Sequence, residues 1–243
     1  MPAVTHNLDE AEQLLFEAEF ESVEPVWASS NYVFVASLQA GELTFSAIYK
    51  PLRGETPLWD FPPGLYKREV AAYRFSRLLG WPMVPPTIIR EGPQGVGSLQ
   101  LAVSHDPNQH YFTLRDEPRF LPQLKRIAVF DIAANNADRK GGHCLLDQAG
   151  RIWGIDHGLC FHESFKLRSV LWDWVGEPIE DQLLEDLDRA GAELAAGSDA
   201  ARPVTELLSP AEVEAAGERI HRLNRNRCFP EPGPHRHWPW PLV

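Results

Sequence analysis

Hydrophobic spacing divides the chain into an N-terminal part with strand patterns and a C-terminal part with helix patterns. Residues 32–38 and 43–51 are rich in aromatic and β-branched side chains and flank a glycine-containing turn, which predicts a β-hairpin. Two further strands are expected at 87–90 and 98–103, again separated by a turn rich in glycine. Residues 8–26 fit a helix followed by a strand, although periodicity alone does not decide this.

Helical spacing begins after a loop rich in proline and glycine. The first predicted helix covers 66–79, and Gly80 ends it. Four further helices are expected at 121–134, 167–175, 180–196 and 210–227. Ser209 and Pro210 open the last one as N-cap and first helical residue. The pattern predicts an α+β fold, with an antiparallel sheet and one helix up to about residue 103 and a mainly helical part after it.

Composition narrows the function classes. With 243 residues, of which 44% are hydrophobic, the chain can form one large domain or two lobes around a cleft. The net charge of -11 disfavours nucleic-acid binding and docking on an anionic membrane. We find no apolar run of the roughly 18 residues that a stable membrane insertion needs, and no signal-peptide pattern. Three scattered cysteines favour a reducing, cytoplasmic setting.

Polar and charged side chains are concentrated at residues 135–158. Asp138 precedes His143 by a short loop, and a predicted hairpin then leads to Asp156. In an antiparallel pair, the residue that enters the first strand lies beside the residue that leaves the second, so we expect His143 and Asp156 to be neighbours. Two carboxylates and an imidazole in one place are costly unless a cation or a proton transfer uses them.

Two charged residues of the N-terminal part allow an ordinary and a functional interpretation. Lys50 ends an apolar strand, where a lysine is commonly solvated. Glu69 lies in the first turn of a predicted helix, where a carboxylate complements the helix dipole. A lysine on a strand followed by a glutamate on the next helix is also the order in which kinases place their phosphate-binding ion pair.

The spacing of Lys50, Glu69, Asp138, His143 and Asp156 follows that kinase order. Residues 138–158 resemble the catalytic and metal-binding loops of the phosphatidylinositol kinase-like branch of the protein-kinase superfamily. They also resemble HipA-type serine kinases, and most closely small bacterial (actinobacterial-type) proteins of undefined substrate that are grouped as phosphatidylinositol kinase-like. Two positions differ from the pattern: a histidine replaces the usual Asn at 143, and His157 replaces the usual Phe.

The resemblance implies a two-lobed kinase-like fold, with lobes at 1–103 and 104–243. It implies ATP and Mg²⁺ or Mn²⁺ as cofactors, and transfer of a phosphoryl group to a hydroxyl of an unknown acceptor, either a protein or a small molecule. The metal would bind Asp156, and His143 would ligate a second metal or support it from the outer shell. An unperturbed histidine titrates near pH ~6.5, so metal-dependent nucleotide binding is expected to weaken between about pH 7 and 6.

The resemblance also assigns roles to the remaining candidates. Lys50 would bind phosphate and Glu69 would orient it, while Asp138 would accept the proton of the acceptor hydroxyl. Arg139 would lie near the transferred phosphoryl group. The nucleotide would further contact a phosphate loop and the connection between the lobes, namely Ser29, Ser30, Asn31, Leu101 and Val103.

Two other functions are open from the sequence. The histidine at 143 makes a catalytically impaired nucleotide-binding protein, a pseudokinase, plausible. A hydrolase is the third class, because histidine and carboxylate ligands suit Zn²⁺ or Mn²⁺. Its ligands would be Asp138, His143, Asp156 and His157. That site leaves Lys50 and Glu69 without a function, which makes it the weakest of the three.

Overall fold

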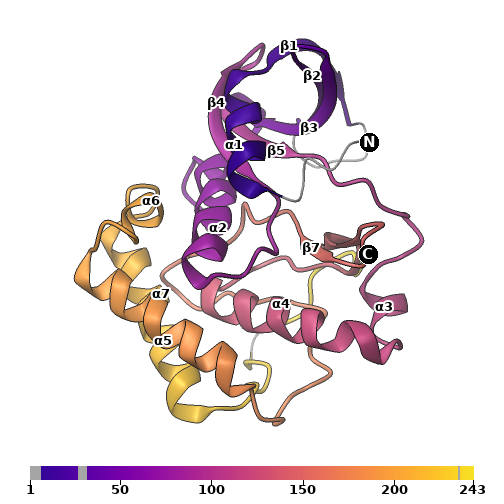
Figure 1. Ribbon diagram of the computed structural model, residues 1–243. Coiled ribbons are helices and arrows are strands. Elements are labelled where there is room, and N and C mark those ends of the chain that lie inside the picture. Colours follow the sequence, from indigo (N-terminus) through magenta and orange to yellow (C-terminus); the bar gives the residue numbers. More distant parts are fainter. Residues whose placement is uncertain (1–6, 27–31, 235) are drawn as a thin grey trace.

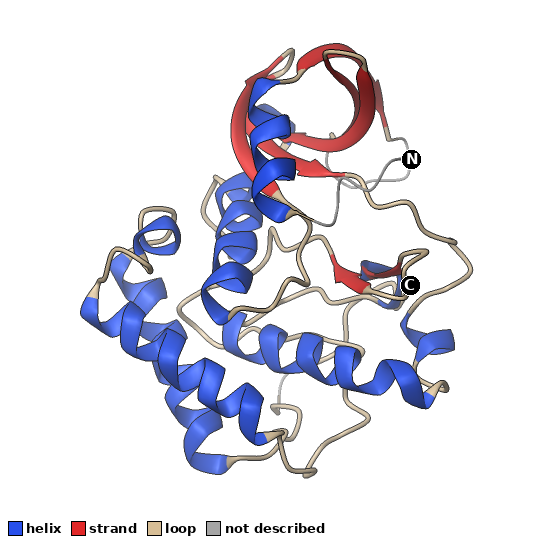
Figure 2. Ribbon diagram, in the orientation of Figure 1, coloured by secondary structure: helices blue, strands red, loops and turns tan. Residues whose placement is uncertain are grey.

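The computed structural model describes residues 7–26, 32–234 and 236–243, and its N-terminal part is built on a five-stranded sheet. All neighbouring strands are antiparallel, in the order β1-β2-β3-β5-β4. Their bounds are β1 Glu19–Pro25, β2 Phe34–Ala40, β3 Leu43–Pro51, β4 Thr87–Gly92 and β5 Gly95–Leu101. The predicted hairpins are confirmed, and Figure 2 shows these strands gathered at one end of the molecule.

Two helices pack on this sheet. Helix α1 (Leu8–Glu17) begins at Asn7, whose side chain caps it, and packs against β2, β4 and β5. Helix α2 (Leu65–Leu79) contacts β4 and β5 with one part of its surface and α5 and α6 with another. The helix-then-strand interpretation of residues 8–26 is therefore confirmed, and α1 adds a second helix to the single one expected in this part (Figure 1).

The remaining helices form the lower part of the molecule in Figure 1. Their bounds are α3 Tyr111–Leu114, α4 Leu121–Ala134, α5 Asp181–Ala196, α6 Arg202–Thr205 and α7 Pro210–Asn226. Three 3₁₀ turns are Leu52–Gly54, Pro118–Phe120 and Gly141–His143, and a small hairpin joins β6 (Cys144–Leu146) to β7 (Ile152–Gly154). No helix of the described ranges combines the length and the apolar composition needed to cross a bilayer.

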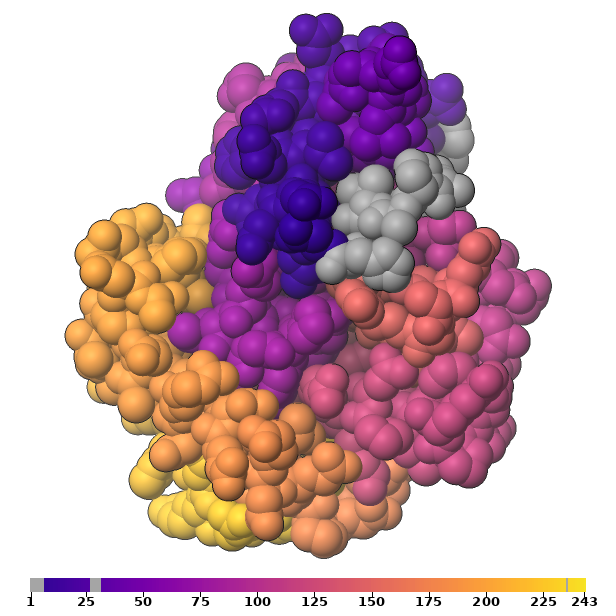
Figure 3. Space-filling view, in the orientation of Figure 1, coloured from indigo at the N-terminus to yellow at the C-terminus, as the bar shows by residue number. Residues whose placement is uncertain are grey.

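The hydrophobic core lies in two large clusters. One fills the concave face of the sheet beneath α1 and includes Leu38 and Tyr49. The other joins α2 to the C-terminal helices, and in it the rings of Phe75 and Phe130 lie 5.5 Å apart. The space-filling view shows the C-terminal helices directly beside the segment that contains α2 (Figure 3). Because α2 belongs to this shared core, its position is fixed relative to the loops around β6 and β7.

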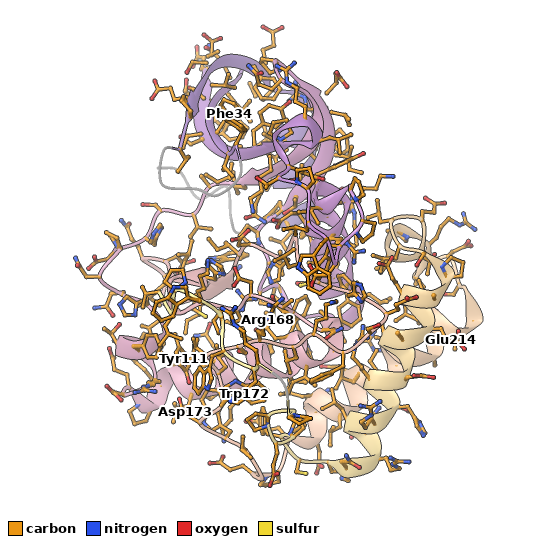
Figure 4. The ribbon with its side chains drawn as sticks, turned by 180° about the vertical axis from the view of Figure 1, so that it is seen from behind. Phe34, Tyr111, Arg168, Trp172, Asp173 and Glu214 are labelled. Carbon is orange, nitrogen blue, oxygen red and sulfur yellow. The ribbon has the colours of Figure 1, made fainter. Side chains whose placement is uncertain are left out.

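The helix predicted at 167–175 is wrong. Residues 167–170 lie beside the loop that follows α4, and residues 173–176 form a turn. The N–H of Arg139 donates to Arg168 O (3.0 Å), and the N–H of Val170 donates to Arg139 O (3.1 Å). These bonds replace the ones that a helix would have made. Figure 4 shows Arg168 near the middle of the molecule, above Tyr111, Trp172 and Asp173.

Candidate active site

Lys50, near the end of β3, forms two ion pairs that join three separate parts of the chain. Its Nζ atom lies 2.5 Å from Glu69 Oε1 on α2 and 2.7 Å from Asp156 Oδ1, beyond β7. Burial opposes the charge on this lysine, but the carboxylates of Asp156 and Glu69 outweigh burial and raise its pKa. The ammonium group is therefore held in its charged form at the bottom of a cleft.

Glu69 is buried, with 3% of its surface exposed, and links Lys50 on β3 to the loop of His157. Its second oxygen, Oε2, accepts a hydrogen bond of 2.9 Å from the backbone N–H of His157. Burial raises the pKa of Glu69, and the nearby Lys50 counteracts part of that rise. A side chain at Gly158 would place its Cβ 3.2 Å from Glu69 Oε1, so a residue without a side chain leaves room for this contact.

Asp156 is aimed by an unusual backbone conformation. Its φ angle is +61°, in the left-handed region that residues other than glycine rarely adopt. Such strain is commonly found at functional positions, where surrounding contacts hold it in place. The Lys50 charge lowers the pKa of this carboxyl below its usual range, which keeps it ionised. With 45% of its side chain exposed, Asp156 is accessible to a ligand in the cleft.

His143 lies next to Asp156, as the hairpin geometry predicted: its Nε2 atom is 3.3 Å from Asp156 Oδ2. Burial lowers the pKa of His143 to about 4, so the ring is neutral at physiological pH. The titration expected between pH 7 and 6 is therefore wrong for this environment. The backbone N–H of Lys140 approaches Nδ1 at 3.4 Å, which directs an Nε2–H toward Asp156 and matches the outer-shell role.

The carboxylate donors in this cleft fit a hard divalent cation. Within the described ranges, no group of three or more His, Cys, Asp or Glu side chains is arranged to enclose a metal. Mg²⁺ typically takes one or two carboxylates from the protein and completes its coordination with phosphate oxygens and water. Asp156 supplies such a carboxylate, and Asp138 lines the same pocket.

Asp138 is placed by the loop that follows α4. Its backbone N–H donates to Asn136 Oδ1 (3.0 Å), and its carboxylate pairs with Lys140 Nζ at 3.1 Å. Burial raises the pKa of Asp138, against the opposing effect of Lys140. Asp138, Lys50, Glu69 and Asp156 all line one pocket of about 200 Å³. Asp138 and Asp156 therefore line the same pocket.

Arg139 does not lie where the resemblance placed it. Its side chain is completely buried and donates to Asp131, to the backbone oxygens of His143 and Ile155, and to His157 Nε2. All of these partners belong to the protein, so this guanidinium holds the loops of the site together and does not face a transferred phosphoryl group. The Arg139–Asp131 pair is closed to solvent, so Asp131 is a structural carboxylate.

His157 is likewise unsuited to the metal site of a hydrolase. Its ring is fully buried, and Nε2 accepts a 2.7 Å hydrogen bond from Arg139. Burial lowers its pKa well below the ordinary value, so it stays neutral. The lone pair that would bind a metal is already used, which removes one of the four ligands that a hydrolase would need.

The other nucleotide-binding candidates are placed less directly. Ser29, Ser30 and Asn31 lie outside the described residues. Leu101 ends β5 and is buried, and Val103 follows in the connection to α3; neither lines the 200 Å³ pocket.

Two residues that shape the site, Glu55 and Lys140, were not predicted from the sequence. Glu55 accepts backbone hydrogen bonds from Gly64 and Tyr66, each 2.8 Å long, and so holds the start of α2. Lys140 lines the pocket beside Asp138. The sequence signal for Lys140 is its basic side chain two positions after Asp138. Glu55 lies in a loop without a recognisable motif.

Solved structures define the class of fold. The chain superposes on hydra Fam20, in a structure determined with sugar, with a TM-score of 0.56, 13% identity and coverage of 90% of this chain and 87% of the other. It superposes on the Helicobacter pylori proinflammatory kinase CtkA with a TM-score of 0.51, 13% identity and coverage of 87% and 93%. This protein therefore has a kinase-like α+β fold, as expected.

Sequence relatives identify the family. Protein Rv2133c of Mycobacterium tuberculosis is 39% identical over 96% of this chain and 95% of its own length, so the chain belongs to the Rv2133c family. Phosphatidylinositol 4-kinase gamma 4 of Oryza sativa is 34% identical over 43% of this chain, but only 22% of that kinase is covered. No protein-family model matches the chain. These likenesses support a kinase-like family and do not point to HipA-type kinases in particular.

Proposed function

We propose that this protein is an ATP-dependent phosphotransferase that moves the terminal phosphoryl group of ATP to a hydroxyl of an acceptor. The observation that carries the proposal is the position of Lys50, paired with both Glu69 and Asp156 in a pocket that Asp138 also lines. Phosphoryl transfer needs mainly positioning and charge neutralisation, and this set supplies both. A metal hydrolase has no use for a lysine that neutralises two carboxylates.

Each residue has a role that follows from its contacts. Lys50 would exchange its pairing with Asp156 for nucleotide phosphate, while Glu69 keeps its rotamer fixed. Asp156 would hold Mg²⁺ or Mn²⁺, which supplies positive charge to the phosphates when bound, and His143 would orient that carboxylate or ligate a second ion. Asp138 would accept the acceptor's proton as the new oxygen–phosphorus bond forms and the bond to the β-phosphate oxygen breaks.

The proposal also names the residues that would contact the rest of the nucleotide. Ser29, Ser30 and Asn31 would contact the phosphates, and Leu101 and Val103 would contact the base. Residues 1–103 and 104–243 would form two lobes of one structural unit.

The three cysteines, all in the described part of the chain, are free thiols, which supports a cytoplasmic setting. The net charge of -11 favours a protein or small-molecule acceptor over an anionic membrane lipid, whatever the partly matching lipid kinases act on.

A nucleotide-binding protein without transfer activity is the second candidate. It is favoured by His143, whose Nε2–H is directed at Asp156 Oδ2 and so competes for an oxygen that a metal would use. The two candidates share nucleotide binding and differ in turnover. A hydrolase that needs no nucleotide would require His157, and that ring is occupied by Arg139.

One experiment separates these candidates. Thermal stability should first be compared with ATP, ADP and GTP, each with Mg²⁺ or Mn²⁺, because a ligand of the folded state raises the melting temperature. Radiolabelled ATP is then incubated with the protein and a bacterial extract divided into protein and small-molecule fractions, with Asp138→Asn as the control. Label transfer by the wild type alone supports the phosphotransferase. Nucleotide binding without transfer supports the second candidate, and absence of nucleotide binding contradicts both.

A further inference from the structure

A second pocket, remote from the proposed phosphotransfer chemistry, lies at the C-terminal half of α7. It has a volume of about 260 Å³, is lined by α4, by α7 and by the segments that follow Asp156 and α7, and is open to solvent on one side, where Phe165 and Arg222 are exposed. Its apolar walls are formed by Ile132, Phe165, Leu223, Cys228, Pro230 and Gly233. Pockets of this kind, largely apolar with a few polar groups, are the usual form of small-molecule sites.

Two arginines of α7, the buried Arg219 and the exposed Arg222, also line the pocket, together with Asn226 and Glu231. Residues three apart on a helix lie on the same face, so both side chains belong to one side of the pocket. Arg219 is only 6% exposed, and its Nε donates to Ala133 O at 2.8 Å. Its Nη2 atom is buried and has no hydrogen-bond partner among the described residues.

None of the ion pairs in the described part of the chain includes Arg219 or Arg222. Glu212 and Glu218 act on the charge of Arg219 only from a distance. Glu231 also lines the pocket, but its side chain is exposed and forms no ion pair with either arginine. Burial lowers the pKa of Arg219 to about 10, which still leaves it charged at neutral pH. A buried N–H group of a charged guanidinium that lacks an acceptor, such as Arg219 Nη2, is costly, and an anion in the pocket would remove that cost.

We propose that this pocket binds a small amphipathic carboxylate, with its head group at Arg222 and Arg219 and its hydrocarbon chain between the apolar walls. A carboxylate fits the planar guanidinium fork, and with a single charge it is easier to desolvate in an apolar pocket than a doubly charged phosphate. A ~150 Å³ cavity takes the six heavy atoms of benzene, so 260 Å³ accommodates about ten. Octanoate has that size.

The pocket is connected to the proposed active site through the backbone. Arg219 contacts two carbonyl oxygens, Ala133 O at the end of α4 and His162 O at 3.4 Å. The side chain of Asn135 donates to the same His162 oxygen (2.8 Å), and Asn135 begins the loop that carries Asp138. A ligand that fixes Arg219 therefore stabilises the folded state at the base of this loop.

The test measures binding of octanoate and of its neutral isostere octanamide to the purified protein by calorimetry, in the absence of nucleotide. A charge-assisted hydrogen bond corresponds to about tenfold or more in affinity, so octanoate should bind at least tenfold more tightly than octanamide. Arg222→Gln leaves Arg219 in place, so it should reduce that advantage severalfold and leave octanamide binding unchanged. Arg225→Gln is the matched control, because Arg225 is exposed on the same helix, as Arg222 is, but does not line the pocket.

Two further measurements locate the hydrocarbon chain. Affinity should rise about threefold to fourfold per added CH₂ from hexanoate to octanoate. Ile132→Phe, which narrows the apolar wall, should weaken octanoate and octanamide together by several fold. Equal binding of octanoate and octanamide, equal effects of Arg222→Gln and Arg225→Gln, or unchanged binding in Ile132→Phe would overturn the proposal. The readout needs no ATP, so its failure is distinct from failure of the proposed phosphotransfer.

Discussion

Arg139 and Asp131 form a two-pronged ion pair that is closed to solvent. Arg139 Nε lies 2.7 Å from Asp131 Oδ2, and Arg139 Nη2 lies 2.9 Å from Asp131 Oδ1. The same guanidinium holds the backbone oxygens of His143 and Ile155, the residues on either side of the small hairpin. One side chain therefore fixes the distance between the loop of Asp138 and the loop of Asp156.

Replacing Arg139 by lysine should destabilise the protein strongly. Lysine keeps the charge but cannot reproduce the planar fork, so Asp131 and two carbonyl oxygens would lose partners in a buried place. Breaking a buried pair costs about 3–5 kcal/mol, and we expect a loss of at least ~3 kcal/mol in urea unfolding. Arg119→Lys is the control, since its pair with Glu117 is exposed and a loss within ~0.5 kcal/mol is expected. Equal losses in both variants would contradict the role assigned to Arg139.

Lys50→Ala should weaken ATP binding by at least about tenfold, because the variant removes the charge that faces the phosphates and leaves two carboxylates close together. Calorimetric titration with ATP and Mg²⁺ measures this effect. Lys67→Ala is a suitable control, because Lys67 is exposed on α2 and does not line the pocket. ATP affinity that is unchanged by Lys50→Ala would rule out Lys50 as a phosphate ligand.

Asp138→Asn should leave ATP affinity nearly unchanged and reduce transfer by a factor of about 10² or more, because an amide keeps the shape but cannot accept a proton. In the wild type, burial raises the pKa of Asp138 above its ordinary value. The base is active when deprotonated, so transfer should decline as pH falls through this raised pKa. Single-turnover rates across pH test this, and full transfer by Asp138→Asn would show that another group accepts the proton.

Much of the fold could be predicted from the spacing of hydrophobic and capping residues within short segments. Alternating apolar residues on both sides of a turn are sufficient to define the hairpin of β2 and β3, and the Ser209–Glu212 capping box marks the start of α7. The contact between His143 and Asp156 was predictable because a hairpin brings its two ends together. These features depend on residues that are close in sequence, or on a single pairing.

Hydrogen bonds between segments that are far apart in the sequence could not be predicted in the same way. Residues 167–175 carry a helix-like apolar pattern, yet their backbone groups pair with the loop at Arg139. The resemblance implied that Arg139 lies near the transferred phosphoryl group, and only the structure shows that Asp131 and His157 surround it. Sequence spacing predicted which carboxylates meet Lys50 in one pocket, but not the direction in which the Arg139 side chain points.

His143 should make the stability of the protein depend on pH. Its pKa is about 4 in the folded chain and near ~6.5 in the unfolded chain. Above pH 6.5 both states hold the ring neutral; between 6.5 and 4 only the unfolded state takes up the proton, so stability falls as pH falls. The difference in pKa corresponds to about 3 kcal/mol. His143→Asn should flatten urea-unfolding free energies between pH 7 and 4.5, and parallel curves for both proteins would contradict this assignment.

The same variant tests whether His143 ligates a metal. The ring is already neutral at pH 7, so Nε2 can bind a metal once its proton moves to Nδ1, at the cost of the hydrogen bond that Nδ1 accepts from the Lys140 N–H. Imidazole favours Mn²⁺ over Mg²⁺ more strongly than an amide oxygen does. We therefore expect His143→Asn to shift the preference of nucleotide binding toward Mg²⁺ by about tenfold, with little dependence on pH between 6 and 8. Titrations of ATP with each metal measure the shift. An unchanged Mn²⁺-to-Mg²⁺ ratio would show that His143 acts on Asp156 alone, through the 3.3 Å contact, and does not touch the metal.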